Sequence, residues 1–219
     1  MNRFAFFAVL ATASAVLTGA LAAPAQAQLS RGNLRLTIDA DVLSIAAIER
    51  DPEFAGESNT TVFGIGPNQE GGSLRSGRPT PFGLGVGYVL QPKLILGLRF
   101  GLGLDVVSPD SSDNNTRLLG LSLMPNLTFV PVGKRAKLFL QGAPIFQVSR
   151  SKSDNAKSRT LLGGFGLGIG TFIFITNALS VDLGFHFEGR FGNEEDALGR
   201  DTDIKDLRGV IRLGVSLWT

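Results

Sequence analysis

The chain has 219 residues, of which 28 are glycine, 43% are hydrophobic and none is cysteine. Its 21 lysines and arginines nearly balance 19 acids without forming a basic run, which argues against a nucleic-acid partner, and the lack of cysteine excludes a disulfide framework. The chain is too apolar for a disordered protein, yet beyond its N-terminus it has no run of about 20 apolar residues that could form a membrane-spanning helix.

Residues 1–27 have the pattern of a signal peptide. Arg3 provides a positive start, residues 4–23 are apolar and small, and Ala25-Gln26-Ala27 is an A-x-A cleavage site. A transmembrane helix is the alternative, but the segment lacks a charged stop-transfer flank. We therefore predict an exported protein with a mature domain over residues 28–219.

Alternation of apolar and polar residues dominates the mature domain. Between Lys93 and Val106, every second residue from Leu94 onward is apolar, and the residues between them are mostly glycine or charged. Because successive strand residues point to opposite faces, this pattern predicts a strand with one apolar surface. Its length suits a tilted strand crossing a bilayer, which needs about 9–11 residues. The same reasoning predicts eight strands, at 33–45, 80–90, 93–107, 116–131, 136–149, 159–175, 178–191 and 206–218.

The predicted connections alternate between short and long. Tight turns are expected at Gln91-Pro92, at 132–135 and at Thr176-Asn177. The longer, polar connections are expected at 46–79, 108–115, 150–158 and 192–205. Short turns on one side and long loops on the other are typical of bacterial outer-membrane barrels, and an even strand number places both termini on the short-turn side.

The polar residues of the strands indicate which face points outward. A soluble eight-stranded barrel, such as a lipocalin, keeps its apolar face inside, and alternation alone does not distinguish it from a membrane barrel. Here the polar face consists mostly of glycine and isolated charges of both signs, which suits a narrow interior better than a soluble surface. We therefore predict an all-β fold, a transmembrane eight-stranded antiparallel up-and-down β-barrel, with the lipocalin-like barrel as the alternative.

Two prolines conflict locally with this fold. Pro125 and Pro144 fall within predicted strands, where proline removes a ladder hydrogen bond and a closed barrel has no edge strand. We expect a bulge or bend at each of them.

The charged residues predicted to face the lumen are the candidate functional site. Eight strands leave an interior that side chains nearly fill, and an unpaired buried charge would cost several kcal/mol. We therefore predict a lumen salt-bridge network that closes the barrel, with a selectivity filter or gate as the alternative. Its predicted members are Arg35, Asp39, Asp41, Arg99, Asp105, Asp182, His186, Glu188, Arg190, Arg208 and Arg212.

His186 is the only histidine in the chain. Small barrel enzymes that modify lipid A place such residues near the extracellular rim, whereas His186 falls in the middle of a predicted strand. We expect a structural hydrogen bond to an acid instead of catalysis, and no cofactor. One histidine without cysteine also argues against a metal site. The glycine-rich run 163–170 lacks the Lys-Ser/Thr of a phosphate loop and predicts a stripe of small lumen-facing residues.

Two kinds of loop feature suggest partners. The long segment 46–79 is the best candidate for surface contacts, because exposed loops on rigid scaffolds often carry binding function. Acids within 110–116 and 193–206 could bind divalent cations that bridge lipopolysaccharide, or could simply be solvated.

The alternating segments, the unequal connections and the C-terminal segment 212–219 resemble the small eight-stranded outer-membrane β-barrel family, which includes the transmembrane domain of outer membrane protein A and OmpX-like proteins. The resemblance covers the mature chain and implies a bacterial outer-membrane location. It also implies contact with outer-membrane lipid and lipopolysaccharide, and recognition of the last strand by the outer-membrane assembly machinery. In that family the last strand often ends in a lipid-facing aromatic residue, whereas here the lipid-facing register ends on Thr219 and Trp218 falls on the lumen face.

The function predicted from these features is non-catalytic. We expect a monomeric outer-membrane barrel with a structural or surface-interaction role and a largely closed lumen. A narrow channel for small solutes and a lipid-modifying barrel enzyme are the alternatives.

Overall fold

The computed structural model describes residues 29–52, 56–65, 82–107, 116–131, 136–152 and 157–219, and within these ranges the side chains of residues 62, 64, 65, 104–107, 116 and 118 are not described. The predicted signal peptide lies outside the described residues. Within the described part, no helix is long and apolar enough to cross a membrane. The strands are β1 (Leu34–Pro52), β2 (Ser58–Ile65), β3 (Phe82–Gln91), β4 (Leu94–Val107), β5 (Thr116–Phe129), β6 (Ala136–Lys152), β7 (Lys157–Phe174), β8 (Leu179–Glu195) and β9 (Asp201–Trp218).

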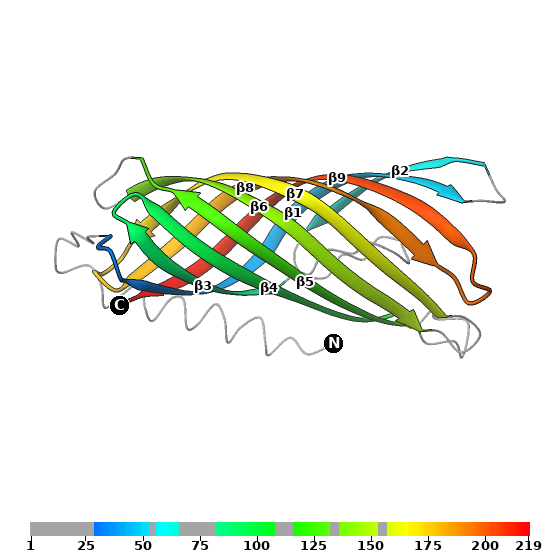
Figure 1. The fold of residues 1–219 in the computed structure, drawn as a ribbon, viewed down its shortest axis with the longest axis horizontal. Helices are drawn as coiled ribbons and strands as arrows, with labels where there is room; N and C mark the ends of the chain where they lie inside the picture. Colours follow the sequence, from blue (N-terminus) through cyan, green and yellow to red (C-terminus); the bar gives the residue numbers. More distant parts are fainter. Residues whose placement is uncertain (1–28, 53–55, 66–81, 108–115, 132–135, 153–156) are drawn as a thin grey trace.

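Eight of these strands close into a ring (Figure 1). From β3 to β9 each strand pairs antiparallel with the next, and β1 pairs with both β3 and β9. Each strand thus donates its backbone hydrogen bonds to two neighbours, which removes the exposed edges of an open sheet. The amide of Thr219 donates to the carbonyl of Leu34 at 3.0 Å, so the C-terminus lies beside the start of β1. The predicted eight-stranded antiparallel barrel is confirmed.

The ninth strand, β2, corrects the prediction that 46–79 is a loop. β1 continues to Pro52, and β2 pairs antiparallel with its second half, from Leu43 to Arg50. β3 pairs with the first half of β1, from Leu34 to Ala40, so β2 and β3 share one side of the same strand. The backbone of β1 beyond Ala40 would otherwise be unpaired on that side, which explains why this polar segment forms a hairpin. The remaining part of the predicted loop, 66–81, lies outside the described residues.

The strands at the long-loop end also extend further than predicted. β6 reaches Lys152 and β7 begins at Lys157, while β8 and β9 enclose a short turn at 196–200. The predicted loops 150–158 and 192–205 are therefore largely strand. Polar residues in these segments predicted that the strands end there. A polar side chain indicates only that its surroundings are polar, and the backbone hydrogen bonds between the strands continue past it.

Exposure establishes that the apolar face points outward. Ile38 on β1 is 66% exposed, Leu84 on β3 62% and Leu167 on β7 58%, whereas Asp39 is 8% exposed and Glu188 is fully buried. A lipocalin-like barrel would show the reverse. The predicted orientation is confirmed, and the soluble-barrel alternative is excluded by this arrangement.

A bulge or bend was predicted at Pro125 and at Pro144, and the bulge is wrong because the register is unchanged. The two prolines lie directly opposite each other, because Leu123 pairs with Phe146 and Leu127 with Gly142 in one unchanged register. Pairing between β5 and β6 is simply interrupted between these positions, while both strands stay continuously paired with their other neighbours. The two prolines therefore cause a single interruption of the hydrogen bonds between β5 and β6.

A bulge occurs instead in β1, between Asp41 and Leu43. Inward-facing residues up to Asp41 have odd numbers, and those from Ser44 onward have even numbers. The extra residue therefore exchanges the two faces of the strand. The consecutive apolar residues Val42 and Leu43 mark this position in the sequence.

Candidate functional site

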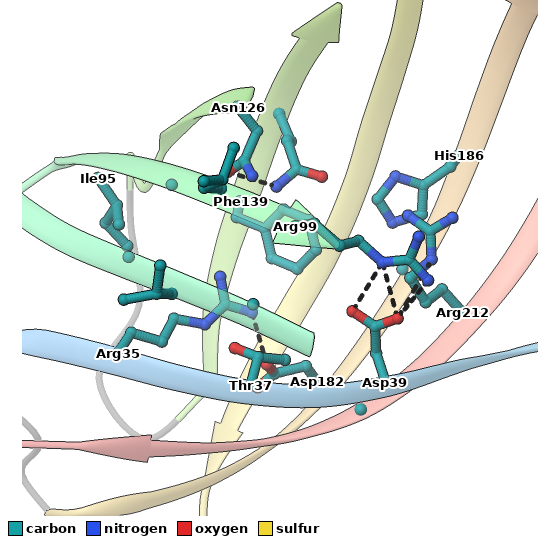
Figure 2. A pocket seen from close by; sticks show the side chains of 18 residues that line it. Arg35, Thr37, Asp39, Ile95, Arg99, Asn126, Phe139, Asp182, His186 and Arg212 are labelled. Carbon is teal, nitrogen blue, oxygen red and sulfur yellow. Dashed lines mark hydrogen bonds and ion pairs between the residues drawn. The ribbon is translucent and has the colours of Figure 1, made fainter. Parts of the chain in front are cut away.

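The centre of the lumen is an ionic network that spans the barrel (Figure 2). Arg99 on β4 donates from Nε to Oδ1 of Asp39 on β1 at 2.8 Å and from Nη2 to the same oxygen at 2.5 Å. Both side chains are buried, at 7% and 8% exposure. β3 stands between these two strands, so the pair crosses one whole strand. Such a charge-assisted, forked contact is among the stronger hydrogen bonds available to a side chain.

Arg212 on β9 connects this pair to a second group of charges. Its Nε donates to Oδ1 of Asp41 at 2.7 Å, and its Nη2 donates to Oε1 of Glu188 at 3.2 Å. Glu188 also accepts a hydrogen bond from Arg190, and Arg208 pairs with Asp206. Arg35 pairs with Asp182 at 2.7 Å nearer the short-turn end. The network therefore consists of linked arginine–carboxylate pairs and not of a row of charges of the same sign.

The charges of this network balance within the part of the chain that the structure describes. Five arginines and five carboxylates, all buried or nearly so, form its ion pairs, namely Arg35, Arg99, Arg190, Arg208 and Arg212 with Asp39, Asp41, Asp182, Glu188 and Asp206. The structure thus brings together every predicted member except Asp105, whose side chain is not described. Asp206 was not among the predicted members because it was grouped with the polar acids of 193–206, although it shares the register of Arg208 and Arg212.

Glycines on neighbouring strands make room for the large lumen side chains. A Cβ atom at Gly83 on β3 would collide with the guanidinium of Arg99 and the carboxylate of Asp39. A Cβ atom at Gly168 would lie 2.5 Å from Nδ1 of His186, and one at Gly97 would lie 2.6 Å from the Oδ1 atom of Asn126. The glycine stripe of the sequence therefore supplies the space that lets long side chains cross a narrow barrel, as predicted.

His186 occupies the lumen without forming a catalytic pair. Its ring is 7% exposed and lies against Gly168 and Gly184 on one side and near Arg212 on the other. The expected hydrogen bond to an acid is not formed with any described residue. No described serine or threonine bonds to the ring either, so His186 has no hydroxyl nucleophile beside it among the described residues. Among the described residues there is also no group of three potential metal ligands.

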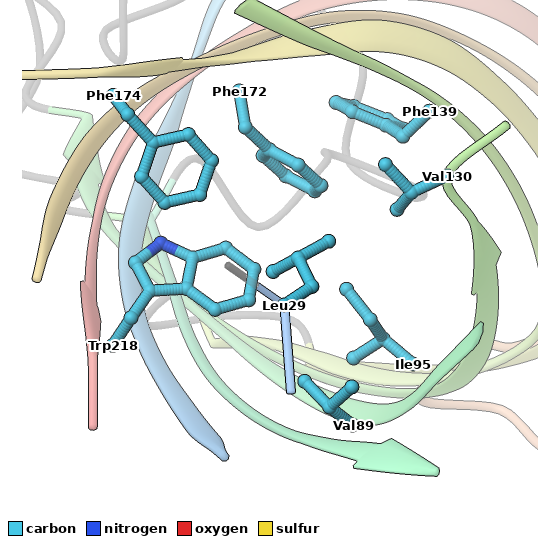
Figure 3. Packing of buried hydrophobic residues seen from close by; sticks show 8 residues of the cluster. All are labelled: Leu29, Val89, Ile95, Val130, Phe139, Phe172, Phe174 and Trp218. Atoms are coloured by element: carbon cyan, nitrogen blue, oxygen red, sulfur yellow. The ribbon is translucent and has the colours of Figure 1, made fainter. Parts of the chain in front are cut away.

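An aromatic plug fills the short-turn end of the lumen (Figure 3). Phe139 stacks on Phe172 at 4.5 Å between ring centroids, and Phe172 meets Trp218 edge-on at 5.5 Å. The guanidinium of Arg35 lies 4.5 Å from the Phe172 ring centroid, a cation–π contact that joins the plug to the ionic network. Leu29 packs into the same cluster from the N-terminal side. The complete plug is Leu29, Val89, Ile95, Val130, Phe139, Phe172, Phe174 and Trp218.

The lumen-facing position expected for Trp218 is confirmed, since the residue is 4% exposed and its Nε1 donates to Ser180 Oγ at 2.9 Å. The plug itself was not predicted. Its signal in the sequence is the presence of large apolar residues in the lumen register near strand ends, as at Ile95 and Phe172.

A small cavity lies between the plug and the ionic network. A cavity of about 60 Å³ lies among Arg35, Arg99, Asn126, Phe139 and His186. It is large enough for a few waters, since one water needs about 10–15 Å³ of such volume. Toward the long-loop end, a second apolar cluster of Ala46, Ile48, Leu162 and Ile204 lies inside the wall. The described interior therefore has apolar clusters toward both ends of the lumen, with the ionic network and a third apolar cluster of Met124, Ala143 and Ile145 between them.

A larger hollow, of about 620 Å³, is lined mainly by residues of the outer surface. Its lining includes Phe165, Phe187 and Phe191, each more than half exposed, together with Gly189 and the Lys205–Glu49 ion pair. It belongs to the apolar exterior and does not enlarge the lumen.

Comparison with known proteins identifies the fold. No protein-family model matches the chain, and no curated protein matches it. Among solved structures, the outer membrane protein OprG of Pseudomonas aeruginosa is similar, with a TM-score of 0.53 and 11% identity over 89% of this chain and 99% of that one. The N-terminal β-barrel domain of OprF from the same organism has a TM-score of 0.48 and 13% identity, covering 86% of this chain and 98% of that one. Ail, the attachment invasion locus protein of Yersinia pestis, has a TM-score of 0.46 and 9% identity, covering 87% and 100%.

These identities are too low to carry a function from one protein to another, and they bear on the fold alone. The likeness to OprG extends over nearly the whole of both chains. The chain therefore has the fold of the small outer-membrane β-barrels.

Proposed function

We propose that this protein is a non-catalytic outer-membrane barrel with a structural or surface-interaction role and a closed lumen. The observation that carries the proposal is the filling of the described interior, in which five ionic pairs and an aromatic plug border a cavity of about 60 Å³. A route for solutes would have to pass both layers. Unpairing even one buried charge would cost about 3–5 kcal/mol.

Single-channel recording of the purified protein in planar bilayers tests the closed lumen. We expect a silent membrane, because the plug and the ionic network both lie across the lumen. Frequent openings of porin size would instead support a channel. Heat-modifiable gel mobility of the same preparation confirms that the protein added to the bilayer is folded.

We also propose that residues 1–27 are a signal peptide and that the mature domain resides in the bacterial outer membrane as a monomer. The outward apolar surface supports this location, because leucine-type side chains over half exposed require a lipid solvent. The long-loop end would face outward and both termini the periplasm. β9, with Leu213, Val215 and Leu217 outward, would be the strand that the assembly machinery recognises.

Membrane fractionation and mass spectrometry of the mature protein test this location. We expect the protein in the outer-membrane fraction with Gln28 as its first residue. Recovery from the soluble fraction without detergent would contradict the proposal.

A further inference from the structure

A group of five cations stands on the outer wall where β5, β6 and β7 leave the apolar belt. Arg117 on β5 lies opposite Lys152 on β6, which lies opposite Lys157 on β7. One step closer to the membrane, Arg150 on β6 lies opposite Arg159 on β7. All five side chains are exposed on the outer face. We call this group the basic belt.

The basic belt contains like charges in direct opposition. Opposed residues of an antiparallel pair have Cβ atoms about 4.5–5.5 Å apart, and like charges at such positions destabilise the sheet. Within the described part of the chain, no carboxylate lies within ion-pair distance of any of the five. Glu195 faces Arg159 across β7 and β8 at the edge of the belt, but the two do not form an ion pair.

Other exposed cations at this end of the barrel are arranged differently. Lys205 on β9 pairs with Glu49 on β1 at 2.7 Å, and Arg200 pairs with Asp196 at 2.6 Å. Exposed charges here can therefore find partners within the chain. Among the described residues, no ion pair offsets the repulsion in the basic belt, so an anionic ligand at this place would be favoured.

The height of the belt indicates the source of that compensation. Arg150 lies opposite Leu119, and the next outward pairs toward the membrane are Leu121 with Val148 and Val148 with Leu161. Successive outward residues of a strand are about 7 Å apart. The cations thus stand one residue step above a surface that contacts acyl chains, which is the level of lipid headgroups at the long-loop end.

We propose that the basic belt binds the phosphate groups of a phosphorylated glycolipid of the outer leaflet, lipopolysaccharide, while the leucine surface below it contacts that lipid's acyl chains. Arginine presents a planar fork of donors that matches phosphate, so the opposed pair Arg150 and Arg159 can hold one phosphate between two guanidinium groups. The inference rests on the proposed outer-membrane location and adds to it a defined lipid site.

The test compares two double variants that each remove two positive charges. Arg150→Gln/Arg159→Gln removes the opposed arginines of the belt, and Arg200→Gln/Lys205→Gln removes two cations that are already paired. Each purified protein, in detergent at low ionic strength without divalent cations, is titrated with lipopolysaccharide, with its dephosphorylated form and with inorganic phosphate.

We expect the belt variant to bind lipopolysaccharide at least tenfold more weakly than the unmodified protein, and the control variant to bind within twofold. Dephosphorylated lipid should bind as weakly as the belt variant does, and millimolar inorganic phosphate should not compete. Equal affinity of all three proteins would overturn the site, as would competition by free phosphate.

Folding is followed independently by heat-modifiable mobility. A folded barrel that extracts only with detergent but lacks lipopolysaccharide affinity refutes the belt and leaves the proposed function intact. A protein that is soluble without detergent refutes the proposed function itself.

Discussion

Gly83 lies directly beneath the guanidinium of Arg99, which reaches across β3 to the carboxylate of Asp39. The contact exists only because position 83 has no side chain. Gly83→Ala should therefore destabilise the barrel by about 1–3 kcal/mol, the usual cost of overpacking a filled interior. Urea unfolding in lipid vesicles measures this change.

Gly163→Ala is the matched control for this substitution, because a Cβ atom there meets nothing within 4 Å and the residue lies on the outer face. It should be neutral or slightly stabilising. Equal effects at both positions would show that strand propensity, and not the Arg99–Asp39 contact, determines the result.

The Arg99–Asp39 pair should behave as a unit. Arg99→Met leaves Asp39 buried with fewer partners and should cost about 3–5 kcal/mol of unfolding free energy. Combining it with Asp39→Asn removes the stranded charge and should recover part of that loss. A double-variant cycle in vesicles measures the coupling between the two residues. Additive losses would argue that Arg212, which lies 3.8 Å from Asp39, already compensates that carboxylate in the single variant.

The aromatic plug should be the barrier at the short-turn end. Phe139→Ala/Phe172→Ala removes two stacked rings from β6 and β7 and should convert a silent bilayer into one with small, brief openings, because the ionic layer remains. Single-channel recording provides the measurement. Phe146→Ala/Phe165→Ala removes two rings from the outer face of the same strands and should leave the bilayer silent. Openings in this control would indicate general loosening of the wall.

The depth dependence of the outer wall offers a further prediction. Leu98 lies mid-strand on the apolar face, whereas Leu94 is the first residue of β4. Leu98→Arg should cost about 2–4 kcal/mol and Leu94→Arg about 0–1 kcal/mol, because a charge is least tolerated at the bilayer midplane. Refolding into vesicles at graded urea concentrations measures both. A tolerated arginine at Leu98 would contradict the lipid-facing assignment.

The alternation of apolar and polar residues was sufficient to predict the closed fold and which charges face inward, because the face of a strand residue follows from its position in the alternation. It did not predict which charges pair with each other. Arg99 finds Asp39 across an intervening strand, so the partners depend on strand stagger and on the glycine between them. Asp206 was missed because it was grouped with the loop acids of 193–206, whereas β9 already begins at Asp201.

The strand ends show a second limit of the sequence pattern. Lys152 and Lys157 were assigned to a loop, yet they are directly paired in the β6–β7 ladder. Polarity signals departure from lipid, whereas backbone pairing continues as long as two strands run side by side. β2 was harder to predict. It forms because β3 pairs with β1 only as far as Ala40 and leaves the rest of β1 unpaired on that side, and this is known only when the register between β1 and β3 is known.

Pro125 and Pro144 lead to the last prediction. A hydrogen-bonded pair in an antiparallel ladder exchanges two N–H···O bonds, and two opposed prolines provide neither donor. Pro125→Val/Pro144→Val restores both donors in the existing register and should extend pairing through the gap. Two hydrogen bonds contribute about 1–3 kcal/mol, and the lost rigidity of two prolines offsets about 0.8–2 kcal/mol, so a gain of no more than about 2 kcal/mol is expected.

Hydrogen exchange by NMR in lipid nanodiscs tests the geometry directly, since the new amides at positions 125 and 144 should be protected as strongly as those of Leu123 and Leu127. Pro125→Val alone supplies one donor and should give about half the gain. Rapid exchange at both positions in the double variant would show that the two strands are held apart there by something other than missing donors. The nearest candidates are the buried side chains of Met124, Ala143 and Ile145, which pack behind the gap.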